Sequence, residues 1–180
     1  YGYGFDLKDA TAKLGALPYG QTLTIPFARI PAEVTAESLL STLYTDVLGE
    51  FQTPYQGDDN NNRNTNLALA CAAINDIILL PGQEFSYNAA LGERTTAAGY
   101  KPAASYVNGL TVDTIGGGIC QVSSALYYCT LVADLDVIFR DSHGFATDYM
   151  PLGMDSAVSW GSLDFKFKNN TDYPIKITAT

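Results

Sequence analysis

The sequence predicts an α+β fold in which two main helices pack on a mixed or antiparallel sheet. Two stretches, about residues 66–78 and 119–133, carry apolar residues at helical spacing. Several shorter runs alternate apolar with polar residues, as strands do, and they outnumber the helices. The length of 180 residues and the 47% hydrophobic composition suit one compact domain with a fragment of another.

Residues 1–45 are predicted to be the tail of a preceding domain, separate from a second domain over residues 46–180. Residues 6–16 have the spacing of a helix, and Leu23–Phe27 alternates like an edge strand that contains Pro26. Thr35 is a candidate N-cap for a short helix through Leu40. No catalytic residue types cluster in this part of the chain.

The second domain begins with a polar segment, Asp58–Asn66, that has no periodicity and is predicted to be a loop. Asn66 is expected to cap the helix of residues 66–78, which Pro81-Gly82 would follow. Asn108-Gly109 predicts a hairpin turn. The remaining predicted strands are Val137–Phe139, Ala157–Trp160, Leu163–Phe167 and Ile175–Ile177, with a turn at Asn169–Asp172 joining the last two in a closing hairpin.

The charge of the chain argues against some classes of function. A formal net charge of −9 disfavours nucleic acid, whose phosphates need a basic surface. No apolar run approaches the roughly 18 residues of a membrane span, and no signal peptide is present. Because the chain begins at Tyr1 rather than Met, we expect a targeting segment and any membrane anchor to lie upstream of it.

The glycine run before Cys120 is the most informative stretch for chemistry. Three successive glycines permit positive φ angles and close approach of a ligand to the backbone. Cys120 falls in the first turn of the predicted helix of residues 119–133, where the helix dipole is expected to lower the pKa of a thiol. The backbone N–H groups of Gly117 and Gly118 are candidates to hold an oxyanion. The sequence therefore indicates a nucleophilic cysteine, although a small buried cysteine beside a tight turn would fit the same spacing.

His143 is the one histidine of the chain, so it is the single candidate base for Cys120. Asp141, Asp148, Asp155 or a backbone carbonyl could orient its second ring nitrogen. The alternative is a histidine with a structural role. A zinc site would need paired ligands such as Cys-x-x-Cys, which the sequence lacks, so we expect no metal and no cofactor.

The three cysteines differ in their predicted places. Cys120 and Cys129 lie nine residues apart, on opposite faces of one helix and roughly 13 Å apart along its axis, so they cannot form a disulfide. Cys71 and Cys129 each lie on the apolar stripe of a helix, which predicts that they are close in space. They would form a disulfide in a secreted protein or pack as two reduced thiols.

Several ordered motifs resemble the VanW family over about residues 48–180. The motifs are Arg63-x-x-Asn66-Leu67-x-Leu69-Ala70, Pro81-Gly82-x-Glu84-Phe85-Ser86, Gly92-x-Arg94-Thr95, the stretch from Gly116 to Tyr127, Tyr149-x-Pro151-x-Gly153-x-Asp155, and Leu163–Asn170. Residues 1–45 look like the end of the peptidoglycan-binding domain that often precedes VanW domains. Family members often carry a further histidine where this chain has Asp141.

The resemblance implies an extracellular, cell-wall protein associated with glycopeptide resistance, whose partners are peptidoglycan stem peptides. It implies an L,D-transpeptidase with Cys120 as nucleophile and His143 as the proton shuttle. A thiol peptidase and a non-catalytic peptidoglycan-binding module are the alternatives. The expected substrate or oxyanion contacts come from Arg94, which could instead be a surface charge, and from Gln121, Ser123, Tyr149 and Asp155.

Overall fold

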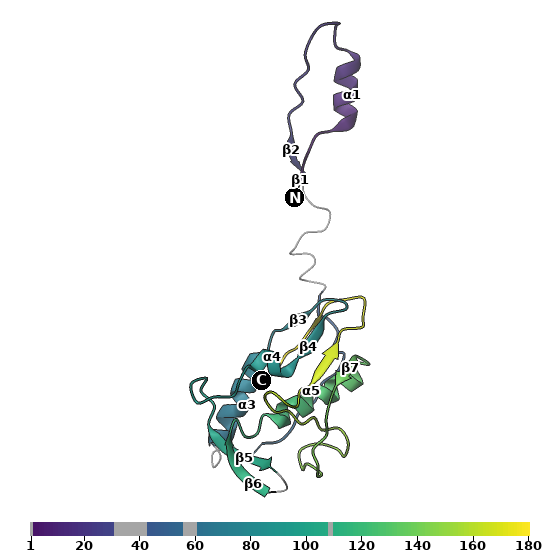
Figure 1. The fold of residues 1–180 in the computed structure, drawn as a ribbon. Coiled ribbons are helices and arrows are strands. Elements are labelled where there is room, and N and C mark those ends of the chain that lie inside the picture. Colours follow the sequence, from purple (N-terminus) through teal and green to yellow (C-terminus); the bar gives the residue numbers. More distant parts are fainter. Residues whose placement is uncertain (1, 31–42, 56–60, 108–109) are drawn as a thin grey trace. The chain divides into compact units, whose positions relative to one another are not determined.

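The computed structural model describes residues 2–30, 43–55, 61–107 and 110–180. The chain divides into two compact units, Tyr1–Thr45 and Asp46–Thr180 (Figure 1). The described residues of each unit form at least one helix and antiparallel strands, so the predicted α+β class is confirmed.

The first unit is small. Strands β1 (Gly2–Gly4) and β2 (Ala28–Ile30) pair antiparallel around helix α1 (Leu7–Gly15), which confirms the helix predicted over residues 6–16. The Asp6 carboxylate caps α1 by accepting the backbone N–H groups of Lys8 and Asp9. The strand predicted at residues 23–27 does not form, since pairing begins only at residue 28. The helix predicted from Thr35 lies outside the described residues.

The second unit contains the longer elements. Its described residues form helices α3 (Asn61–Ile74), α4 (Tyr87–Leu91) and α5 (Cys120–Val132), and strands β3 (Ile78–Leu79), β4 (Glu84–Ser86), β5 (Pro102–Val107), β6 (Leu110–Ile115), β7 (Asp136–Phe139), β8 (Lys166–Lys168) and β9 (Ile175–Lys176). The strands form three small antiparallel sheets, in the orders β4-β8-β7, β3-β9 and β5-β6.

Both predicted helices form, but the one predicted at about residues 66–78 is shifted toward the N-terminus at both of its ends. Helix α3 begins at Asn61, inside the segment expected to be a loop, and ends at Ile74. Asp76 has a positive φ of 61°, which ends the helical path, and Ile78 belongs to β3 rather than to the helix. Asn66 therefore lies inside the helix, and its predicted role as an N-cap is wrong. Helix α5 matches the helix predicted over residues 119–133.

The strand predictions were partly correct. The predicted hairpin is the β5-β6 pair, which confirms its two strands, whereas the turn at Asn108-Gly109 lies outside the described residues. Strand β7 confirms the prediction at residues 137–139. The stretch Ala157–Trp160 makes only isolated bridges, at Ala157 and Ser159, and the Val158 backbone between them contacts the Cys120 sulfur instead of a strand.

The predicted closing hairpin is wrong, because the last two strands enter different sheets. Strand β8 pairs with β4 and β7, whereas β9 pairs with β3. The buried Asn169 side chain explains the divergence. Its amide donates to the carbonyl oxygens of Leu79 (3.0 Å) and Tyr173 (2.8 Å), which turns the chain toward β3.

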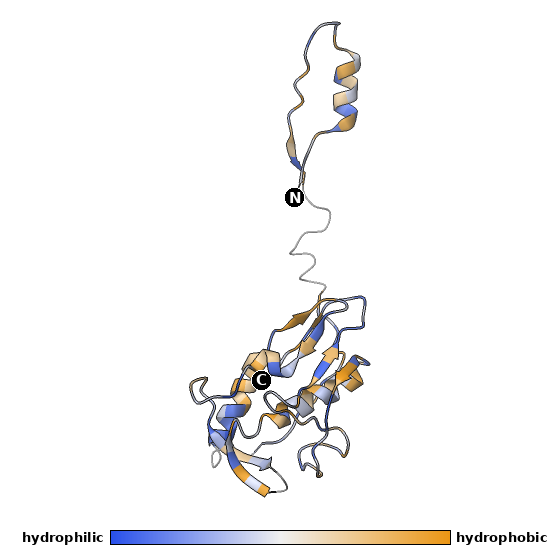
Figure 2. Cartoon of the chain, in the orientation of Figure 1, coloured by the Kyte–Doolittle hydropathy of each residue, from blue (hydrophilic) through white to orange (hydrophobic). Residues whose placement is uncertain are grey.

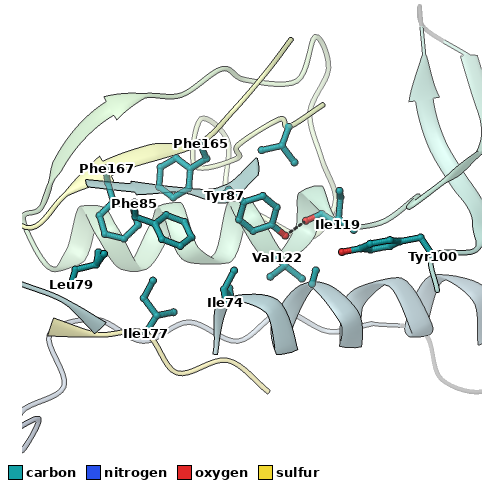
Figure 3. Close-up of a cluster of buried hydrophobic side chains, with 12 residues drawn as sticks. Ile74, Leu79, Phe85, Tyr87, Tyr100, Ile119, Val122, Phe165, Phe167 and Ile177 are labelled. Carbon is teal, nitrogen blue, oxygen red and sulfur yellow. Dashed lines mark hydrogen bonds between the residues drawn. The ribbon is translucent and has the colours of Figure 1, made fainter. Parts of the chain in front are cut away.

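The core of the second unit lies between α3 and α5 (Figure 3). Hydrophobic residues recur along both helices and the strands packed with them (Figure 2). Phe165, Phe167 and Tyr87 are almost fully buried there. The Tyr87 hydroxyl donates to the carbonyl oxygen of Ile119 at 3.0 Å, so the core fixes the residue that precedes Cys120 (Figure 3). The start of α5 is therefore held by packing and by a buried hydrogen bond.

Candidate cysteine–histidine site

The turn before Cys120 requires its glycines. Gly116 and Gly118 have φ angles of 84° and 106°, which side chains of L-residues rarely adopt. Gly117 lies against strand β5, where a Cβ atom would overlap the carbonyl oxygen of Ala103. The three glycines therefore serve a backbone geometry that delivers Cys120 at the first position of α5.

A buried asparagine from α3 holds this turn. The Asn66 side-chain amide donates to the carbonyl oxygens of Gly117 and Lys101, each at 2.9 Å, and its oxygen accepts the Lys101 N–H at 2.8 Å. Asn66 is fully buried. Local sequence patterns assigned this residue to a helix cap, since nothing local reveals partners 35 and 51 residues away.

We expect Asn66→Ala to lower the free energy of unfolding by about 3 kcal/mol, because it removes three buried or partly buried hydrogen bonds. Asn62→Ala is the matched control on the same helix, since its exposed side chain makes one bond, to the Pro102 carbonyl oxygen. That control should cost no more than about 1 kcal/mol. Urea denaturation of both variants measures the difference, and equal losses would contradict the role given to Asn66.

The Cys120 thiol is partly buried against the backbone of residue 158. Its sulfur lies 3.5 Å from both the N–H nitrogen and the carbonyl oxygen of Val158. Burial raises the pKa of the thiol, and this outweighs the lowering by the Val158 N–H and the guanidinium groups of Arg94 and Arg63. The predicted lowering of the pKa at the helix start is therefore wrong, because desolvation is the larger effect. A nucleophilic Cys120 needs a base to remove its proton.

Two backbone N–H groups at the start of α5 have no acceptor among the described residues. They belong to Gly118 and to Cys120 itself, whereas the Gly117 N–H donates to the Thr114 carbonyl oxygen at 3.1 Å. The two open donors lie on either side of Ile119, where the glycine turn meets the helix. Of the two glycines singled out for an oxyanion, Gly118 keeps a donor available and Gly117 does not.

Gln121 and Ser123 have other partners. The Gln121 amide donates to Thr53 Oγ1 (2.9 Å) and to the Pro54 carbonyl oxygen (2.8 Å), and its oxygen accepts from Arg63 (2.7 Å). The Ser123 hydroxyl lies 2.7 Å from the carbonyl oxygen of Ser156. These donors are engaged within the protein, so the structure gives both residues positioning contacts where the sequence suggested oxyanion donors.

The sequence left four candidates to orient His143, and the structure shows that the Asp155 carboxylate binds it. Asp155 Oδ2 lies 2.7 Å from His143 Nδ1 and 2.6 Å from the His143 backbone nitrogen. Arg140 adds a contact of 3.2 Å to the other carboxylate oxygen. Burial tends to raise the pKa of Asp155, but the hydrogen bonds and charge of His143 outweigh it, and the net pKa is lowered. Asp155 therefore stays ionised and fixes the imidazole.

One short segment, residues 155–158, links the histidine to the cysteine helix. Asp155 holds His143 at one end, and Val158 contacts the Cys120 sulfur at the other. Between them, the Ser156 backbone N–H donates to Ser124 Oγ at 2.8 Å. The segment thus runs along the first turns of α5 and places the His143–Asp155 pair beside the helix that carries Cys120.

Tyr149 completes the surroundings of the thiol. Its phenol lies near Ser124 and close enough to Cys120 for their charges to interact. Burial, followed by the Cys120 charge, raises the pKa of Tyr149, so the phenol remains a proton donor at neutral pH. The structure therefore brings Tyr149 and Asp155, which belong to one sequence motif, near Cys120.

We expect Asp155→Asn to lower the free energy of unfolding at pH 7 by about 2 kcal/mol, because an amide cannot replace the charge-assisted bonds to His143 and Arg140. The folded pKa of Asp155 lies below its unfolded value of about 3.9, so this stabilisation exists above that pH and is lost as the pH falls through the folded pKa.

Denaturation of wild type and Asp155→Asn at pH 7 and near pH 3 measures this effect. The difference between the two proteins should shrink at the lower pH. Asp148→Asn is the control, because Asp148 is exposed and forms no ion pair among the described residues. A difference that stayed constant with pH would contradict the assignment.

Arg94 packs against the glycine turn, with its Cβ and Cγ next to Gly116. Its guanidinium donates to the Gly92 carbonyl oxygen (2.9 Å) and to Asn88 Oδ1 (2.7 Å), and it lies 5.8 Å from the centroid of the Trp160 ring. Burial lowers the pKa of Arg94, although the neighbouring phenols and Cys120 oppose this shift. It is thus a partly buried group at the site rather than a solvated surface charge.

The remaining predictions concern disulfides, metals and membranes. All three cysteines are free, so the bridge considered between Cys71 and Cys129 is not formed. Across residues 2–30, 43–55, 61–107 and 110–180, no group of three His, Cys, Asp or Glu side chains could hold a metal ion. None of the helices in these ranges has the length and apolar character needed to cross a membrane.

A family described as VanW like protein matches residues 62–180, which include the glycine turn, Cys120, His143 and Asp155. The chain belongs to the VanW-like family. Residues 1–45 lie outside the matched region. No solved structure matches the chain.

Two curated relatives support this VanW-like assignment. The YoaR protein of Bacillus subtilis strain 168, described as uncharacterized, is 38% identical over 181 residues, covering 99% of this chain and 59% of the relative. The vancomycin B-type resistance protein VanW of Enterococcus faecalis strain V583 is 31% identical over 170 residues, covering 90% of this chain and 58% of the relative. The chain therefore spans somewhat under three-fifths of the length of these relatives.

Proposed function

We propose that this VanW-like domain is a cysteine acyltransferase of the cell wall, an L,D-transpeptidase that acts on peptidoglycan stem peptides. The observation that carries the proposal is that residues 155–158 bind the Cys120 sulfur at one end and the His143–Asp155 pair at the other. A relative named for vancomycin resistance supports an extracellular, cell-envelope setting. In this proposal residues 1–45 are the end of a peptidoglycan-binding domain.

His143 acts as the base in the first half of the reaction. Asp155 accepts the hydrogen at Nδ1, which leaves the lone pair on Nε2 to take the thiol proton. This step is needed because burial raises the pKa of Cys120 and keeps the free thiol protonated. The sulfur then attacks the carbonyl carbon that precedes the terminal D-residue of the donor stem.

The tetrahedral intermediate carries its negative charge on the former carbonyl oxygen. The N–H groups of Gly118 and Cys120, which have no acceptor among the described residues, donate to that oxygen. The C–N bond breaks, and the terminal D-residue leaves as an amine with the proton held by His143. A thioester between the stem peptide and Cys120 remains.

The second half of the reaction reverses these roles. The amine of an acceptor stem attacks the thioester carbonyl carbon and gives a proton to His143. The C–S bond breaks, the new peptide cross-link is released, and the proton returns to the Cys120 sulfur. Tyr149 lines the thiol in this scheme and binds the substrate through its protonated phenol.

Incubation of the full chain with disaccharide-tetrapeptide tests the proposal. We expect a dimeric muropeptide lacking one terminal D-residue, and a protein mass increased by the acyl group on the tryptic peptide that contains Cys120. Shortened monomer without dimer would instead indicate a thiol peptidase, in which water replaces the acceptor amine. Binding without any product would indicate a non-catalytic module. Either of the last two results would contradict transpeptidation.

A further inference from the structure

Arg94 has a charge without a matching anion. Its two hydrogen bonds within the described residues go to neutral oxygens, of Gly92 and Asn88, and they use two of the five N–H donors of a guanidinium. Within the described residues no carboxylate forms an ion pair with it. A partly buried cation is stabilised by a paired anion, so this group is suited to a charged ligand.

A surface depression adjoins this guanidinium. It is lined by Asn88, Trp160, Gly161, Ser162, Leu163 and Asp164. Asn88 also accepts a hydrogen bond from Arg94, and the half-exposed Trp160 ring lies 5.8 Å from the guanidinium carbon. Two of the residues that line the depression, Asn88 and Trp160, therefore contact the Arg94 guanidinium.

The acidic residue in this depression is occupied by its own neighbours. The Asp164 carboxylate accepts the Ser86 hydroxyl at 2.7 Å and the backbone N–H groups of Asn88 and Phe165, each at 2.8 Å. Its oxygens are held by these donors rather than by Arg94. Asp164 acts on the Arg94 charge from a distance, but no ion pair joins them, so the guanidinium keeps N–H donors for an anion from outside the protein.

The depression also lies next to the thiol. Arg94 Cβ and Cγ pack on Gly116, where an added Cβ would lie 3.0 Å from each. Its charge acts on Cys120, and Trp160 follows Val158, which contacts the sulfur, by two residues. A group that binds Arg94 would therefore lie within one or two residues of a peptide bond attacked by Cys120.

We propose that Arg94 binds the free carboxylate of the donor's terminal residue, and that it restricts the site to stems that end one residue after the scissile bond. The inference rests on the proposed function and names the part of the substrate that Arg94 recognises. A guanidinium matches a carboxylate through two parallel N–H bonds. In a chain with a net charge of −9, a local cation is required to attract an acidic substrate.

A four-way comparison tests this specificity. Wild type and Arg94→Gln are assayed on a disaccharide-tetrapeptide with a free C-terminal carboxylate and on the same compound with a C-terminal amide. We expect wild type to favour the acid by about 50-fold in kcat/KM, because the amide lacks the charged group that would pair with Arg94. Removal of one partner of a buried charge pair has an effect of this size. Arg94→Gln should treat both compounds alike. If wild type turned over the acid and the amide at equal rates, the inference would be overturned. It would also be overturned if Arg94→Gln still preferred the acid.

Two controls separate recognition from structure. Arg63→Gln removes the other cation that acts on Cys120, and it should keep the preference for the acid, whatever it does to the rate. Arg94→Lys retains the charge and should keep part of the preference for the acid. A retained preference would show that the site still folds when residue 94 is changed. Loss of the preference in Arg63→Gln would indicate a general field effect and contradict a specific Arg94 contact.

A binding measurement keeps the inference testable if no turnover occurs. Cys120→Ala cannot react, so fluorescence anisotropy with labelled tetrapeptide acid and amide reports recognition alone. Stronger binding of the acid that Arg94→Gln abolishes would support the Arg94 contact even if the acyl transfer proposal failed. Equal binding of acid and amide, or binding of neither, would overturn the contact.

Discussion

Cys120→Ala is expected to abolish acyl transfer, with a loss of at least about 10⁴-fold in kcat, the scale seen when a nucleophile is removed. The alanine has no sulfur to attack the stem carbonyl, and no thioester can form. The fold should persist, because Tyr87 holds Ile119 and Asn66 holds the glycine turn without help from the thiol. Product formation and the acyl adduct, followed by mass spectrometry, measure the loss.

Cys71→Ala and Cys129→Ala are the matched controls for this variant. Both thiols are free and partly buried, as the Cys120 thiol is. Each control substitution therefore removes the same atom, a sulfur, from a similar degree of burial. Both variants should form product at rates within a few-fold of wild type. Full activity in Cys120→Ala, or an equal loss in the two controls, would contradict the role of Cys120 as nucleophile.

Local sequence patterns were sufficient for the elements that carry the candidate site. The spacing of apolar residues gave α5 to within one residue at either end, and the glycine run marked the turn before it. The presence of a single histidine reduced the choice of base to His143. The helix and the turn depend on neighbouring residues, and the lone histidine is a matter of composition. Both kinds of information can be obtained from a single sequence.

The choice among Asp141, Asp148 and Asp155 depended on the fold. All three carboxylates lie within 12 residues of His143, and their spacing does not distinguish them. The path of residues 155–158 along α5 decides for Asp155, through hydrogen bonds to serine hydroxyls more than 30 residues away. The buried partners of Asn66 and Gln121 were missed for the same reason, because they join distant segments.

The pKa of Cys120 could not be inferred from its place in a helix. The position at the start of α5 lowers the pKa of a thiol, but the thiol is also packed between the Val158 backbone and the core. Desolvation is then the larger effect, and the pKa is raised. Burial is a property of the assembled fold, so a local pattern gave the wrong sign.

Asp141 joins the histidine loop to the rest of the site through its backbone. The Asp141 carbonyl oxygen accepts the Ala157 N–H at 2.8 Å, which ties the histidine loop to residues 155–158. This contact uses only the backbone of residue 141, so any side chain can supply it. The link that orders the His143–Asp155 pair is therefore kept in this chain without a second histidine.

Gly117→Ala is expected to lower the free energy of unfolding by at least about 4 kcal/mol, beyond the usual cost of an overpacked methyl group. The new Cβ would overlap the Ala103 carbonyl oxygen, a backbone atom that cannot rotate away as a side chain can. Relief requires separating strand β5 from the turn, which also breaks the bond from Asn66 to the Gly117 carbonyl oxygen. Much of a typical domain stability of about 5–15 kcal/mol would be lost.

Gly144→Ala is the control for Gly117→Ala, because its added Cβ meets no atom within 4 Å and its φ is not positive. Its free energy of unfolding should stay within about 0.5 kcal/mol of wild type. Urea denaturation of both variants, with amide exchange at α5, distinguishes the outcomes. If the free energy of unfolding of Gly117→Ala were within about 1 kcal/mol of the wild-type value, strand β5 would have to be able to move away from the turn at little cost. In that case, close backbone packing would not explain why the middle residue of the turn is glycine, since its φ is not positive.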